Sequence, residues 1–194
     1  MTTGSSLWYL SRGTGVVSLV LLTLVMTLGI LTRGGRRLPG LPTSSVTMLH
    51  RNASLLALAF LAVHISTAII DPYVTINIVD AFVPFGSDYQ PLWLGLGALA
   101  LDLGLALVIT SLVRVRLGLR AWRAVHWAAY AMWPLILVHG FVMGPDIRSG
   151  WLLGLSVSCV ALVGVAATWR LIAVPASAKP SGTRPMGAKS VGVR

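Results

Sequence analysis

Apolar stretches long enough to cross a membrane as helices recur along this chain, and they constrain its fold more than any other feature. Spanning the hydrocarbon core takes about 20 mostly apolar residues in a helix. Five stretches of this kind are expected, at 8–32, 46–70, 92–113, 121–143 and 151–173. Pro or Gly stands at nearly every boundary between them, as helix ends require. The sequence therefore predicts an all-α, polytopic membrane bundle.

The distribution of charge agrees with this prediction. Charged residues make up 10% of the 194 residues, whereas roughly a quarter is usual in a soluble domain. The net charge of +10 does not indicate nucleic-acid binding, because the Lys and Arg residues lie in short segments between the apolar stretches. Of these 15 residues, all but Arg12 and Arg148 flank what would be one side of the membrane. The positive-inside rule then predicts an external N-terminus.

The last residues differ in composition from the rest of the chain. Residues 175–194 combine Pro, Gly, Ser and Ala with scattered Lys and Arg. This composition predicts a disordered, basic cytoplasmic tail, too short for a nucleotide-binding fold. The transmembrane domain is expected to occupy residues 1–174. A multi-pass location in the cell membrane, the inner or plasma membrane of a bacterium, is expected.

The four histidines, His50, His64, His126 and His139, all fall in the second and fourth stretches. Ionisable groups inside a membrane are costly and indicate function by default. In a helix, His50 and His64 lie about 21 Å apart along the axis, and His126 and His139 about 19.5 Å apart. Both stretches would run in the same direction, so His50 shares a depth with His126, and His64 with His139. Two imidazoles at each of two depths favour two stacked haems over zinc or copper, whose ligands converge on one ion.

The spacing of His126 and His139 poses a difficulty of phase. Thirteen steps in a straight helix leave the second ring about 140° away from the first. Pro134 lies between them and can kink the helix, which would bring His139 to the face of His126. The alternative is that Pro134 is a tolerated membrane proline without this role.

At these residues the chain resembles the ferric reductase-like transmembrane domain family, which includes iron reductases, NADPH oxidases and the haem-binding membrane subunit of methionine sulfoxide reductase systems. Members carry H-x13-H on one helix and H-x12-H on the next but one, which His50 and His64, then His126 and His139, match here. The resemblance covers roughly residues 45–145. It implies two haem b groups, an inner one held by His50 and His126 and an outer one held by His64 and His139, that carry electrons outward.

The chain also departs from this family's pattern. Members typically have six helices with the ligands on the third and fifth, so a counterpart of the first helix is expected to be missing. The flavin and NAD(P)H domains of the larger reductases are likewise expected to be missing. The resemblance therefore implies an oxidoreductase subunit that depends on a separate electron donor, either a flavoprotein reductase or a quinol. The outer acceptor would be ferric iron, oxygen or a partner reductase.

Three arginines are candidates for binding the haem propionates. Arg51 and Arg123 flank the inner histidines and could make charge-assisted hydrogen bonds, or could serve only to set topology. Arg12 lies inside the first stretch and could pair with an outer propionate or with Asp102.

The positions of the Trp residues and of one long apolar connection also predict where they lie in the membrane. Trp residues 8, 93, 122, 151 and 169 lie near the ends of stretches, where an aromatic belt is expected, while Trp127 and Trp133 lie deeper and either line a haem or pack. The apolar connection at 71–90 is expected to lie over the outer haem. A different class of function, a non-redox scaffold or transporter whose histidines relay protons, would not require matched depths.

Overall fold

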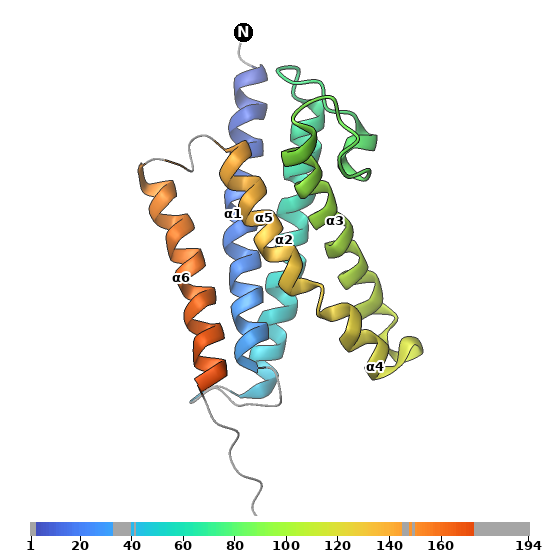
Figure 1. The fold of residues 1–194 in the computed structure, drawn as a ribbon, viewed down its shortest axis with the longest axis vertical. Coiled ribbons are helices and arrows are strands. Elements are labelled where there is room, and N and C mark those ends of the chain that lie inside the picture. The colour runs from blue at the N-terminus through green and yellow to red at the C-terminus, as the bar shows by residue number, and fades with distance from the viewer. Residues whose placement is uncertain (1–2, 33–39, 41, 145–147, 149, 173–194) are drawn as a thin grey trace, which may run out of the picture.

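The structure is a computed structural model that describes residues 3–32, 40, 42–144, 148 and 150–172. In these ranges the chain forms six α-helices and one short 3-10 helix, and no strand (Figure 1). The elements are α1 (Thr3–Thr32), α2 (Thr43–Ile70), η1 (Ile78–Ala81), α3 (Pro91–Leu112), α4 (Arg114–His126), α5 (Ala129–Met143) and α6 (Gly150–Ile172).

The helices confirm the predicted polytopic all-α bundle. α1, α2, α3 and α6 are each long and apolar enough to cross a membrane. α4 and α5 pass the same test only as a pair, bent by 44°, so the described residues hold four candidate spans, or five if the pair is one broken span. The orientation in the membrane stays a prediction. The tail at 175–194 and the arginines at 33, 36 and 37 lie outside the described residues.

The spans pack as two close pairs, α1 with α2 and α3 with α5. α1 also contacts α5, and α6 packs against α1 (Figure 1). We call the end of the bundle where α1 begins the upper end and the opposite end the lower end, as Figure 1 shows them. α1 runs downward, α2 upward, α3 downward and α5 upward, so α2 and α5 are parallel.

Hydrogen bonds from α5 and α6 to α1 hold these helices together. The indole Nε1 of Trp133 on α5 donates a hydrogen bond of 3.0 Å to Oγ1 of Thr23, and Arg170 on α6 donates one of 3.2 Å to the carbonyl of Ile30. Thr23 in turn donates to the carbonyl of Leu19, at 2.7 Å. Polar groups in lipid must be satisfied within the protein, and these bonds do so while tying α5 and α6 to α1.

The bend between α4 and α5 lies at Trp127 and Ala128. Pro134 lies inside α5, and its expected effect on the phase of His139 stays a prediction. At the break, backbone hydrogen bonds from Ala128 to Val125 and from Tyr130 to Trp127 join residues three apart, at 2.8 and 3.0 Å. Such a turn advances about 120° per residue instead of about 100°. The overwinding moves His139 toward the phase of His126, which resolves part of the difficulty posed by their spacing.

The connection between α2 and α3 folds over the upper end of the bundle. Its 3-10 helix η1 begins with a reciprocal cap, in which the backbone N–H of Asn77 donates to the Asp80 carboxylate at 2.8 Å. Phe85 lies against α3 at Gly95, where any side chain would overlap it. Because Gly95 has no side chain, the connection between α2 and α3 can approach the bundle closely.

Candidate functional site

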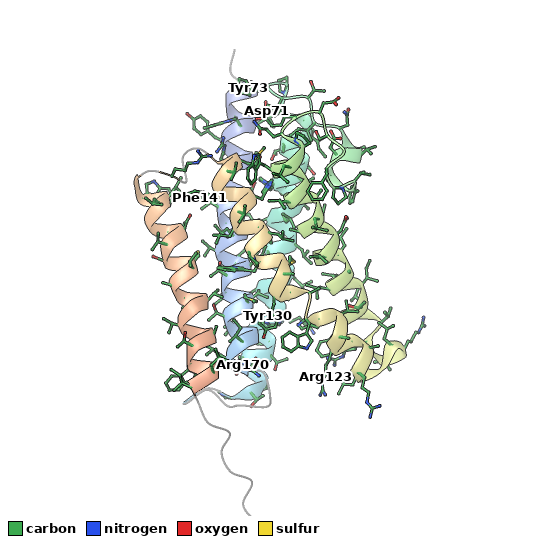
Figure 2. The ribbon with its side chains drawn as sticks, in the orientation of Figure 1. Asp71, Tyr73, Arg123, Tyr130, Phe141 and Arg170 are labelled. Carbon is green, nitrogen blue, oxygen red and sulfur yellow. The ribbon has the colours of Figure 1, made fainter. Side chains whose placement is uncertain are left out.

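A cavity of about 1350 Å³ runs through the bundle between the α1–α2 pair and the α3–α5 pair. Its lining extends from Asp71 and Tyr73 at the upper end to Tyr130 and Arg123 toward the lower end (Figure 2). A pocket for one drug-sized molecule occupies about 300–1,000 Å³. The cavity is therefore large enough for more than one such group, and it spans both predicted depths.

The cavity brings together every site residue that was predicted from the sequence. These are the four histidines and the three arginines: His50, His64, His126, His139, Arg12, Arg51 and Arg123. The histidines come from α2, α4 and α5, which face one another across the space. All four imidazole side chains are half-buried, because one side of each faces the cavity.

The upper level of the site consists of His64 and His139, which lie toward the upper ends of α2 and α5 and line the same cavity. Nδ1 of His64 lies 2.8 Å from the carbonyl oxygen of Ser11, and Nδ1 of His139 lies 2.8 Å from that of Trp93. A carbonyl can only accept, so in both rings Nδ1 donates its hydrogen. Nε2 of each ring therefore keeps its lone pair, which is the nitrogen arrangement of a metal-ligating histidine.

The lower level consists of His50, near the lower end of α2, and His126, the last residue of α4. Among the described residues, the buried Nδ1 of neither ring has a hydrogen-bond partner. The His126 ring instead stacks on Trp122, with centroids 4.8 Å apart and planes 27° apart. The two levels thus hold their imidazoles by different contacts.

The arginines lie at the two ends of the cavity. The Arg12 guanidinium lies over the Trp8 ring at the upper end, 4.7 Å from the ring centroid. Arg51 and Arg123 are exposed and belong to the lower end. Asp102 is half-buried on α3 and is not among the residues that line the cavity. Each level of histidines therefore has at least one guanidinium close to it.

Sequence reasoning missed several residues that contact the imidazoles. Trp122, which was assigned to the aromatic belt, contacts His126, and their spacing of four residues on one helix could have indicated it. Gly15 and Gly97 lie directly against His64 and His139. Trp133 packs in the core instead of lining the cavity, whereas Trp127 does line it.

Comparisons with known proteins give one result. No curated protein and no solved structure matches this chain significantly. The family model described as ferric reductase like transmembrane component matches residues 14–138. This segment is more than half of the chain, it includes His50, His64 and His126, and it ends one residue before His139. The chain therefore belongs to the family of ferric reductase-like transmembrane components.

Proposed function

We propose that this protein is a di-haem b electron-transfer protein that moves electrons across the membrane, from a donor on the cytoplasmic side to an acceptor on the outer side. Its family is one of membrane electron-transfer components that typically bind haem. The observation that carries the proposal is that four imidazoles line one cavity, two of them toward each end of the bundle. Two protein ligands at each level are what a haem iron takes, since the porphyrin supplies the others.

The donor atoms at the upper level fit such a group. His64 and His139 each direct Nδ1–H to a backbone carbonyl at 2.8 Å, which fixes the ring and makes Nε2 a better ligand. The buried Nδ1 atoms of His50 and His126 lack this support. Their Nε2 atoms remain the donors that would hold the lower haem. When bound, haem supplies a reversible one-electron couple between ferric and ferrous iron.

The chain's own residues would supply binding, orientation and exclusion of water. Arg12 at the upper level and Arg51 and Arg123 at the lower level would hold haem propionates by charge-assisted hydrogen bonds. The apolar lining, with residues such as Leu58, Leu101 and Ile136, would keep water from the space between the two levels. The connection that carries η1 would close the upper end.

The proposed direction rests on the distribution of arginine. Topology rules put the lower end, with Arg51 and Arg123, in the cytoplasm. The donor would be a separate flavoprotein reductase or a membrane quinol. At the upper end a second cavity of about 920 Å³ shares Trp8, Arg12 and Tyr89 with the first. This opening is the proposed place of electron transfer to the acceptor.

A proton relay through the histidines is less well supported. A relay needs each nitrogen to pass its proton to a group that can take it and release another. Nδ1 of His64 and of His139 instead faces a backbone carbonyl at 2.8 Å, which cannot pass on a proton, and the Ser11 hydroxyl is farther from His64 Nδ1, at 3.4 Å. The hydrogen bonds of the upper pair therefore favour ligation.

The experiment that tests the proposal is a redox titration of four variants in the purified full-length protein. His64→Ala and His139→Ala should lose or alter the same haem component. His50→Ala and His126→Ala should together affect the other. Shared behaviour of His50→Ala and His139→Ala would contradict both the pairing and the parallel course of the ligand helices.

A further inference from the structure

Three of the four imidazoles lie against a glycine on a neighbouring helix. A Cβ atom added at Gly97 on α3 would lie 2.6 Å from Cε1 of His139, and one at Gly15 on α1 would lie 3.0 Å from Cε1 of His64. A Cβ atom at Gly29 would lie 3.7 Å from Cε1 of His50. The first distance is not compatible with any side chain, the second is tight and the third is an ordinary contact. The imidazoles of the upper level therefore occupy space that a side chain would otherwise fill.

Each of these glycines is preceded, four residues earlier, by the carbonyl that its histidine faces. Gly15 follows Ser11, and Gly97 follows Trp93, whose carbonyls accept from His64 and His139. In a helix, the side chain at position i+4 leans back over the turn that carries the carbonyl of residue i. Glycine at that position leaves the carbonyl open to a ring from another helix.

The same arrangement recurs at His50 in a looser form. Its glycine is Gly29, and four residues earlier the Val25 carbonyl faces the ring, although Nδ1 does not complete a hydrogen bond. Gly15 and Gly29 are 14 residues apart on α1, and His50 and His64 are 14 residues apart on α2. Because α1 and α2 are antiparallel neighbours, equal spacings let both histidines meet a glycine.

We propose that Gly15, Gly29 and Gly97 are positioning residues for the axial histidines. Each lets an imidazole lie against the backbone of a neighbouring helix with Nδ1 toward a carbonyl, so that Nε2 is left for the iron. The inference rests on the proposed function, because it assigns these glycines a role in haem ligation. The space for an added Cβ atom is smallest at Gly97, larger at Gly15 and largest at Gly29.

The fourth histidine shows what replaces the glycine. Ser111 lies 14 residues after Gly97 on α3, and its hydroxyl donates to the carbonyl of Leu107 at 2.6 Å. The same hydroxyl accepts from the Trp122 indole at 3.1 Å, and that indole stacks on His126. The Leu107 carbonyl thus accepts from a serine hydroxyl of its own helix. His126 stacks on the Trp122 ring, and among the described residues its Nδ1 has no hydrogen-bond partner.

The test substitutes alanine at each glycine in the full-length protein and measures haem per chain together with the low-spin and high-spin fractions. Gly97→Ala should convert most of the upper haem, which is about half of the total, to high spin. Gly15→Ala should convert a smaller part of the upper haem to high spin. Gly29→Ala should change little. Gly13→Ala is the matched control. Gly13 lies on the same helix as Gly15, and a Cβ atom added there would have no described neighbour within 4 Å.

Retention of the lower haem shows that a variant has folded, and selective change of the upper haem is a result that general destabilisation would not give. If Gly97→Ala loses both haems, the milder Gly15→Ala decides the question. The inference would be overturned if Gly97→Ala and Gly15→Ala both had the same haem content and spin state as Gly13→Ala. A wild-type protein without haem would overturn the proposed function instead, so the two failures are distinct.

Discussion

The upper and lower levels each have two histidines, but the contacts that hold the imidazole rings differ. At the upper level, both Nδ1 atoms lie 2.8 Å from a backbone carbonyl of a neighbouring helix. At the lower level, both Nδ1 atoms are buried and have no hydrogen-bond partner in the part of the chain that the structure describes. The surroundings differ too, since the connection that carries η1 folds over the upper end, while the lower level includes the broken span at Trp127.

The difference suggests that the upper imidazoles are preorganised and the lower ones are not. A ring held by a hydrogen bond keeps its orientation before any ligand binds and is a more basic donor. A buried, unpaired N–H is unfavourable by about 1–3 kcal/mol, so the lower rings have more to gain from reorientation. We therefore expect the upper level to tolerate the loss of one ligand better than the lower level does.

The largest expected effect comes from removing single histidines. His64→Ala or His139→Ala should keep much of the upper haem as a five-coordinate, high-spin species, because the remaining ring is still anchored. His50→Ala or His126→Ala should lose the lower haem, about half of the total, because among the described residues the remaining ring has no hydrogen bond at Nδ1. Haem content and electronic spectra of the purified variants measure this. Complete loss of the upper haem from the first two variants, with retention of the lower haem in the other two, would contradict this expectation.

A smaller effect is expected from Trp122→Leu. This change removes the ring that stacks on His126 and the donor to Ser111. Aromatic pairs contribute about 0.5–1.5 kcal/mol beyond area burial, so haem affinity at the lower level should fall roughly 2- to 12-fold. Haem titration of the apoprotein checks the value. Trp169→Leu, at an exposed position on α6, serves as the control. An equal loss at both levels would show that Trp122 acts on the whole fold.

A smaller effect on haem binding is expected from Thr23→Val, which should instead lower the stability of the fold. Thr23 lies on α1 between Gly15 and Gly29, and its hydroxyl accepts from the buried Trp133 indole. Loss of that bond should lower thermal stability by a few degrees, as bonds between membrane helices contribute about 0.6–1.7 kcal/mol. Haem occupancy of the folded protein should not change. Thr110→Val, whose hydroxyl bonds only within α3, should leave the melting temperature nearly unchanged.

The smallest effect is expected from removing the chain after Val174. The composition of 175–194 cannot form a core, so the truncated protein should bind both haems as before. Visible spectra normalised to protein measure the outcome. Loss of either haem from a stably inserted truncation would show that the tail contributes to that level.

Much of the bundle and of the candidate site could be predicted from sequence. Apolar length and Pro or Gly at the boundaries give the spans, because a helix in lipid has few alternatives. The spacing of His50 and His64 predicts two levels, because rise per residue is nearly constant. The convergence of the four histidines on one cavity agrees with that prediction.

Features that depend on contacts between helices could not be predicted in the same way. The break at Trp127 and Ala128 contains neither Pro nor Gly, and Pro134 is tolerated inside α5. The roles of Gly15 and Gly97 depend on which helix packs against which, and the sequence alone does not state that. The equal 14-residue spacings of Gly15–Gly29 and His50–His64 were visible, but they acquire meaning only once α1 and α2 are known to be neighbours.

The central claim is that each histidine level holds one haem, and the ratio of haem to protein tests it most directly. Pyridine haemochrome quantitation of the purified full-length protein should give two haem b per chain. The oxidised spectrum should be mainly low-spin, because each iron would have two imidazole ligands. A ratio near zero would contradict the account, and a ratio near one would limit it to a single level.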